Sequence, residues 1–103
     1  MSAFRLTPLA KADIFDIWSY IAEDSEDAAD KVERAIFEAC ESAAKTPLGG
    51  HSRPDLTARR LRFWTLSKYP SYSVVYRPDT APLEIVAVMH GKRNLRRILK
   101  QRQ

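Results

Sequence analysis

Arginine and histidine side chains recur within and just after the strand-like segments of the C-terminal half, where they could act on a phosphate. Arg62 and Arg77 lie in two such segments, and His90 is followed at once by Gly91, Lys92 and Arg93. Guanidinium groups stabilise the charge that develops when a phosphodiester is attacked, and an imidazole titrates near neutral pH and can move a proton. The candidate catalytic residues of a ribonuclease are therefore Arg62, Arg77, His90 and Arg93.

The same cations also suit a binding surface that carries out no chemistry. Arg60, Arg62 and Trp64 alternate along one segment, which places all three on one face of a strand. Paired cations beside an aromatic ring can contact nucleic acid or an acidic peptide, or they can stack within the chain itself. The candidate residues for binding a target or a partner are these three together with Arg77, His90, Lys92, Arg93, Arg96 and Arg97.

Metal and thiol chemistry find less support in the sequence. The two histidines, His51 and His90, have no cysteine or acidic ligand at metal-site spacing, so we expect no metal site, and we expect no cofactor. The single cysteine, Cys40, belongs to an apolar helical stripe and is expected to be a small core residue. One cysteine excludes an intrachain disulfide, which is typical of a cytoplasmic protein.

The charge of the chain is distributed unevenly. Residues 1–46 contain 5 Lys and Arg against 10 Asp and Glu, and residues 47–103 contain 12 against 3, within a net charge of +4. A basic half favours nucleic acid or an acidic partner, although such charges can also do no more than solvate a small protein. The length of 103 residues fits one domain, residues 1–103, and no apolar run is long enough to span a membrane.

Hydrophobic periodicity predicts a strand and two helices in the first half. Residues 3–6 form the strand, and Thr7 and Pro8 supply a helix cap and a first helical residue. A second helix is expected after Ser25 and should end before Pro47. The apolar stripes are Ala10, Ile14, Ile17, Trp18 and Ile21 in the first helix, and Ala29, Val32, Ile36, Ala39, Cys40 and Ala43 in the second. This pattern predicts Trp18 to be buried between helix and sheet.

Three strands are predicted in the second half, at residues 61–64, 72–77 and 83–89. Their connections are too short for a crossover helix, so they should form an antiparallel meander. The nearly continuous apolar run of the last strand predicts a central strand covered on both faces. Residues 51–58 read as a loop, and a short, marginal C-terminal helix is expected from Asn94.

These elements predict an α+β fold in which a helical hairpin covers one face of a small, mainly antiparallel sheet. Leu61 and Phe63 are expected to face the helices, which leaves Arg60, Arg62 and Trp64 on the face open to solvent. Substitutions should distinguish buried residues that stabilise the fold from exposed arginines that do not. Ile14→Ala or Val86→Ala should cost about 2–5 kcal/mol if these positions are buried, whereas Arg62→Ala and Arg93→Ala should leave folding intact.

The order of elements resembles the ParE branch of the RelE/ParE toxin superfamily. The resemblance extends over nearly the whole chain and includes Thr7-Pro8-Leu9-Ala10, the strand Tyr72 to Arg77, and the ending Ile85 to Asn94 with its His-Gly-Lys-Arg-Asn sequence. It implies a strand–helix–helix–strand–strand–strand fold and a cytoplasmic toxin of a bacterial type II toxin–antitoxin module. It also implies a ParD-like antitoxin as partner and DNA gyrase as target, inhibited without hydrolytic chemistry.

RelE-like members of the superfamily cleave messenger RNA on the ribosome instead. They resemble one another in a C-terminal tyrosine, and this chain has no tyrosine after His90. The missing tyrosine argues against an enzyme that cleaves messenger RNA. Two alternatives to gyrase inhibition stay open: a ribosome-dependent mRNA endonuclease, and a relative that is not toxic and binds nucleic acid.

Overall fold

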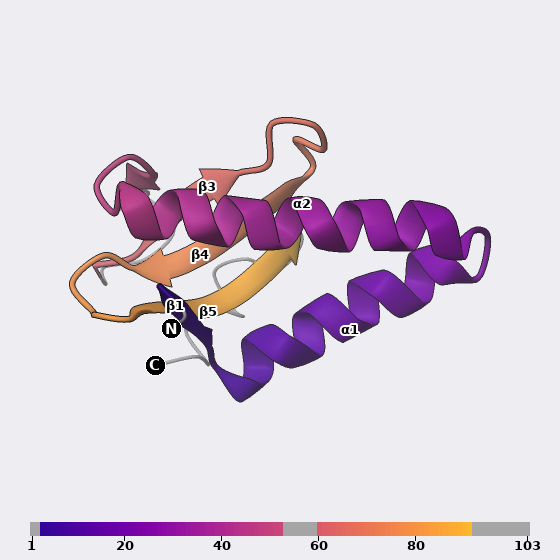
Figure 1. The fold of residues 1–103 in the computed structure, drawn as a ribbon, viewed down its shortest axis with the longest axis horizontal. Coiled ribbons are helices and arrows are strands. Elements are labelled where there is room, and N and C mark those ends of the chain that lie inside the picture. The colour runs from indigo at the N-terminus through magenta and orange to yellow at the C-terminus, as the bar shows by residue number, and fades with distance from the viewer. Residues whose placement is uncertain (1–2, 53–59, 92–103) are drawn as a thin grey trace.

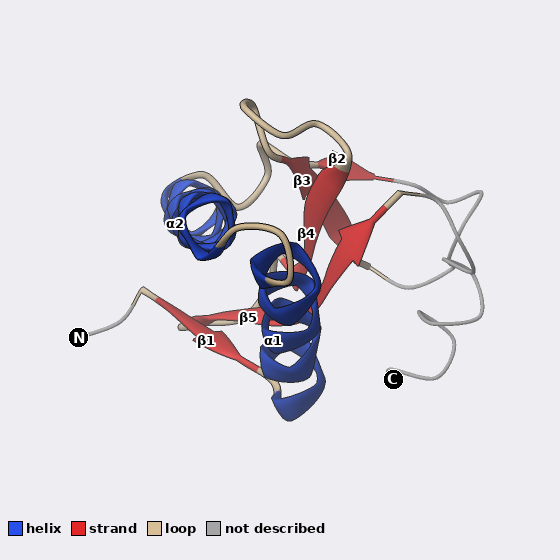
Figure 2. Ribbon diagram, turned by 90° about the vertical axis from the view of Figure 1, so that its right-hand side faces the viewer, coloured by secondary structure: helices blue, strands red, loops and turns tan. Residues whose placement is uncertain are grey.

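Two helices lie on one side of a five-stranded sheet in the computed structural model, which describes residues 3–52 and 60–91 (Figure 1, Figure 2). The elements in chain order are β1 (Phe4–Leu6), α1 (Pro8–Ala22), α2 (Glu26–Lys45), β2 (His51–Ser52), β3 (Arg62–Thr65), β4 (Tyr72–Arg77) and β5 (Leu83–His90). The α+β class and the element order are confirmed. The helix predicted from Asn94 lies outside the described residues. Within those residues no helix combines the length and apolarity that crossing a bilayer requires.

Both helices begin at the caps that the sequence predicts. The Thr7 hydroxyl accepts a hydrogen bond from the Ala10 amide at 3.1 Å, and the Ser25 hydroxyl accepts one from the Ala28 amide at 3.1 Å. Each bond satisfies one of the amides that a helix start leaves without a partner. Helix α2 also has acidic residues in its first turn and Lys45 in its last, which suits the helix dipole. Its predicted stripe is fully buried against the sheet and α1.

The sheet has the strand order β1-β5-β4-β3-β2, with β1 parallel to β5 and the other pairs antiparallel. The predicted antiparallel meander of β3, β4 and β5 is therefore confirmed, and β5 is an interior strand. The prediction that residues 51–58 are all loop is wrong at its start, because His51 and Ser52 pair with Phe63 and Arg62. Such a short edge strand is fixed by the neighbouring backbone, and its own side chains give little signal.

A register shift lets β5 contribute to two apolar clusters. Val75 pairs with Ala87 and Tyr76 with Ile85, so β5 contains one residue more than β4 at this point. This is the pattern of a β-bulge. Side chains on the helix side join the main core, whereas Val86, Ala87 and Met89 join a second cluster with Leu61, Phe63 and Val75. The prediction of a strand buried on both faces is confirmed.

The predicted assignment of sheet faces was wrong for β3. Trp64 pairs with Val74, which belongs to the core under the helices, and Phe63 pairs with Val75, which belongs to the opposite cluster. Paired residues on adjacent strands share a face. Leu61 and Phe63 therefore point away from the helices, and Trp64 and Arg62 point toward the helical side. Alternation predicted which residues share a face, but not which face the helices cover.

Trp18 also differs from its prediction. Its side chain is half-buried, and its indole N–H donates a hydrogen bond to Asp30 of α2 at 2.8 Å. The ring therefore lies along the seam between the two helices and is not covered by the sheet. The reason is geometric, because Trp18 occupies the edge of the α1 stripe, whereas Ala10 and Ile14 are at its buried centre.

Candidate functional site

Arg62 fastens the turn that follows α2. Its Nη1 donates hydrogen bonds to the backbone carbonyls of Gly50, at 2.8 Å, and Leu48, at 3.3 Å. These carbonyls lie in the turn that follows α2, which ends at Lys45. The structure therefore assigns this arginine a clear part in holding the fold.

Tyr76 completes the same arrangement from the neighbouring strand. Its hydroxyl donates to the Pro47 carbonyl at 2.7 Å and accepts from the Gly50 amide at 3.0 Å. Burial raises the pKa of Tyr76, and the hydrogen bond from Gly50 and the positive charge of Arg62 oppose that rise. Because Arg62 and Tyr76 are cross-strand partners, one pair of side chains anchors the whole turn from Pro47 to Gly50.

The role of Arg62 leads to a revised expectation for its substitution. Arg62→Ala should lower the free energy of unfolding by about 1–3 kcal/mol, because two backbone carbonyls lose a charged donor. Urea denaturation followed by circular dichroism measures this. Arg60→Ala is the matched control and should change stability by less than about 0.5 kcal/mol, since its ion pair is exposed. Equal stability of the two variants would contradict an anchoring role for Arg62.

Arg77 lies on the far face of the sheet in a row of three charged residues. Its Nε contacts Glu84 Oε1 at 2.8 Å, and Arg5 Nη2 contacts Glu84 Oε2 at 2.5 Å. The three residues are cross-strand neighbours on β4, β5 and β1. One carboxylate thus serves two guanidinium groups, and the row has a surplus of one positive charge.

Arg60 and Trp64, the two remaining candidates near β3, are not part of one surface. Arg60 is 79% exposed and pairs with Asp79 at 3.4 Å. Trp64 packs on the helix-side core and lines a small cavity of about 100 Å³ with Ala39 and Ser42 of α2. The predicted open face of arginines around an exposed tryptophan is therefore wrong for the described residues, because each of these arginines has a partner within the chain.

His90 ends β5 with its imidazole exposed and stacked on Tyr72. The two ring centroids are 4.4 Å apart and the rings are inclined by 14°. Burial raises the pKa of the Tyr72 phenol, and Tyr20 adds to the rise. Gly91 then turns the chain at φ +72°, a conformation that glycine adopts more readily than any other residue.

The remaining basic candidates, Lys92, Arg93, Arg96 and Arg97, lie outside the described residues. Cys40 is fully buried, and burial raises the pKa of its thiol to about 12. The burial confirms the prediction that Cys40 is a small core residue. In the described residues no group of histidine, cysteine and acidic side chains is arranged to hold a metal ion.

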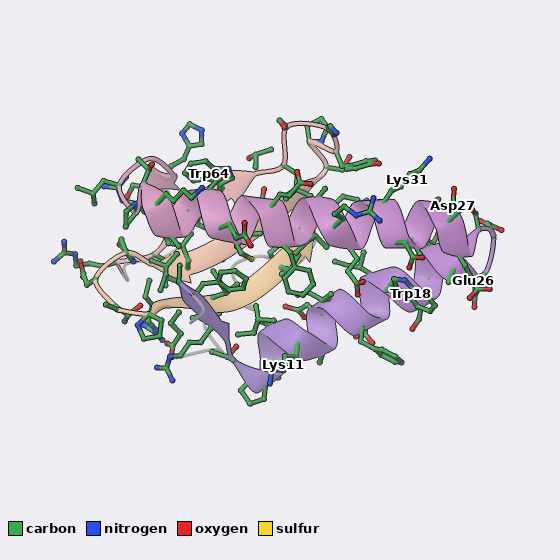
Figure 3. The ribbon with its side chains drawn as sticks, viewed as in Figure 1. Lys11, Trp18, Glu26, Asp27, Lys31 and Trp64 are labelled. Carbon is green, nitrogen blue, oxygen red and sulfur yellow. The ribbon has the colours of Figure 1, made fainter. Side chains whose placement is uncertain are left out.

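Sequence reasoning missed a groove between the two helices. Its lining includes Phe15, Trp18 and Phe37, and its volume is about 450 Å³. Figure 3 shows Trp18 and Lys11, two of the residues that line it. Phe15 is 67% exposed and does not belong to the predicted α1 stripe. An aromatic residue outside the stripe was the one signal in the sequence that could have indicated this groove.

Comparison with known proteins identifies the family to which the chain belongs. Residues 4–95 match the model of the family described as the ParE toxin of the type II toxin–antitoxin system, parDE. A solved structure of the chromosomal ParDE TA system from P. aeruginosa has a similar fold, with a TM-score of 0.71 and 22% identity. The match covers 89% of this chain and 98% of that one. No curated protein matches the sequence significantly.

Proposed function

Because the chain belongs to the ParE toxin family of type II toxin–antitoxin systems, we propose that it inhibits DNA gyrase and is neutralised by a ParD-like antitoxin. Family membership over residues 4–95 is the observation that carries this proposal. Because gyrase acts on the bacterial chromosome, the proposed toxin would act in the cytoplasm. The proposed mechanism is binding, with no bond made or broken by the toxin itself.

The positions of the candidate catalytic residues favour binding over ribonuclease chemistry. His90 pairs with Tyr72 at one end of β4, whereas Arg77 lies at the other end of that strand. Five residues of extended chain separate the two ends by about 17 Å. Arg62 pairs with Tyr76, which precedes Arg77 on β4, but the Arg62 side chain points to the opposite face of the sheet from Arg77. A general acid and the cations that stabilise a phosphorane must surround one phosphate, and these three do not.

The proposed contact residues are the same as in the sequence analysis. Their geometry separates those that are exposed from those that also make contacts within the fold. Arg60 and His90 are exposed, and His90 leads into the most basic stretch of the sequence. That stretch includes Lys92, Arg93, Arg96 and Arg97. Arg62, Trp64 and Arg77 are also held in contacts within the fold, so their substitution tests stability together with function. An acidic, partly disordered antitoxin segment that folds on contact would complement these cations.

Expression of the toxin without its antitoxin tests the proposal. We expect broken DNA, an induced DNA-damage response and intact transcripts, and loss of gyrase supercoiling activity when the purified toxin is added. Arg93→Ala should weaken inhibition by at least about tenfold, equivalent to about 1.4 kcal/mol of binding. Lys31→Ala, which removes an exposed cation from α2, is the matched control and should inhibit fully.

Two other results would point elsewhere. Rapid cleavage of messenger RNA on ribosomes would support the endonuclease alternative, for which the exposed His90 beside Tyr72 is the structural candidate. Unimpaired growth together with tight binding to random duplex DNA would support a nucleic-acid-binding relative. Either result would exclude gyrase as the target.

A further inference from the structure

The Arg5–Glu84–Arg77 row lies on the face of the sheet opposite the helices (Figure 2). The Glu84 carboxylate accepts from Arg5 through one oxygen and from Arg77 through the other, and its side chain is only 17% exposed. The Thr80 hydroxyl accepts from the Glu84 amide at 2.8 Å and donates to the Arg77 carbonyl at 3.1 Å, which ties the ends of β4 and β5 together. Both guanidinium groups are therefore held in place before any ligand arrives.

The two arginines keep donors that a ligand can use. A guanidinium carries several N–H donors, and in the part of the chain that the structure describes Arg77 uses its Nε on Glu84 and Arg5 uses its Nη2. The Arg5 side chain is 62% exposed and that of Arg77 is partly exposed. Because both reach toward one carboxylate from the strands on either side of β5, the two groups lie within about 10 Å of each other. The row can therefore donate to one anionic group or to two neighbouring ones.

The charges of the two layers determine the side from which an anion approaches. Residues 8–45, which form the helical layer, carry 10 acidic and 4 basic side chains. Residues 60–91, which include β3, β4 and β5, carry 4 basic and 2 acidic side chains. A polyanion is therefore repelled by the helical layer and attracted to the face of the sheet that carries the row.

The surroundings of the row favour phosphates over an acidic peptide. Among the described residues, the large hydrophobic side chains that are exposed lie on α1 and in the turn after α2, and they are Leu9, Phe15, Tyr20 and Leu48. A stable protein interface centres on apolar or aromatic side chains that become buried, and the row has none of these beside it. A phosphate backbone needs only donors and positive charge, and arginine binds phosphate through paired hydrogen bonds.

We propose that the Arg5–Glu84–Arg77 row binds the phosphate backbone of duplex DNA, with Arg5 as the main contact and Glu84 as a positioning residue. The binding is independent of base sequence and weak, with a dissociation constant of about 10⁻⁴–10⁻⁶ M at physiological salt. Weak binding differs from the tight binding that would indicate a nucleic-acid-binding relative. The inference goes beyond the proposed function, because the ligand is DNA itself and Arg5 is not among the contact residues proposed for gyrase or an antitoxin.

Fluorescence anisotropy of a labelled duplex at a series of salt concentrations tests the proposal. Arg5→Ala should weaken binding by about fivefold and reduce the slope of log K against log salt by about 0.9, which corresponds to the loss of one phosphate contact. Arg5→Lys keeps the charge without the guanidinium fork, and its affinity should lie between those of the wild type and Arg5→Ala. Arg34→Ala removes an exposed arginine from α2 and is the matched control, which should change both quantities far less. Thermal unfolding confirms that each variant is folded.

Nuclear magnetic resonance locates the bound duplex on the protein. The backbone amides of Arg5, Leu6 and Glu84 should shift as unlabelled duplex is added, and those of Lys31 and Arg34 on α2 should not. Any of four results refutes the proposal: no binding of the duplex, equal losses in Arg5→Ala and Arg34→Ala, amide shifts that leave out β1, or a polyglutamate peptide that binds the row as well as DNA does. None of these measurements involves gyrase. A negative result therefore leaves the proposed function intact, and a toxin that fails to inhibit gyrase can still bind DNA through the row.

Discussion

Gly50→Ala should lower the free energy of unfolding by about 3 kcal/mol, through overpacking and the loss of buried hydrogen bonds. A Cβ at this position would lie 2.4 Å from Tyr76 Oη and 2.9 Å from the Phe63 carbonyl oxygen. Neither atom can yield easily, because Tyr76 is fully buried and the Phe63 oxygen belongs to the sheet backbone. Chemical denaturation followed by circular dichroism measures the effect.

The other glycines and Tyr76 supply the controls for Gly50. Gly49→Ala meets its nearest atoms at 3.0–3.1 Å and should cost less, and Gly91→Ala has open space but a φ of +72°, so it should cost about 1 kcal/mol. Tyr76→Phe removes the clashing oxygen. In the double variant the cost of Gly50→Ala should therefore fall, which a double-mutant cycle detects. Strictly additive costs would mean that Gly50 does not act through the Tyr76 hydroxyl.

The second large effect should come from cavities on both faces of the sheet. Ile14 is 5% exposed in the core under the helices, and Val86 is 3% exposed in the far-face cluster. Ile14→Ala should cost about 2–5 kcal/mol, and Val86→Ala a value toward the lower end of that range because fewer methyl groups are removed. The midpoint of urea denaturation reports both.

Leu48→Ala is the matched control for these cavities, since Leu48 is equally apolar but 67% exposed. It should change stability by less than about 0.5 kcal/mol. A Val86→Ala variant as stable as Leu48→Ala would show that the far-face cluster is not a second core. It would also remove the reason given for the continuous apolar run of β5.

Local patterns were sufficient for both helices, for four of the five strands that the structure describes, and for the family. Thr7 and Ser25 predicted both helix starts, because a capping side chain acts within three residues of its own position. The alternation of β4 predicted which of its side chains share a face, because the side-chain period of a strand is two. The short connections of the last three strands predicted their antiparallel order in the same way. The uneven charge along the chain also has a spatial counterpart in the acidic helical layer.

Contacts between distant residues could not be predicted in this way. The sequence by itself determined the helices, the meander, the family and the set of candidate cations. Only the tertiary structure decided that Trp64 faces the helices, that Arg62 binds the Gly50 carbonyl and that Arg77 shares Glu84 with Arg5. The physical reason is that periodicity and capping are properties of neighbouring residues, whereas the face of a strand and the partner of a guanidinium depend on strand register and on where the helices pack.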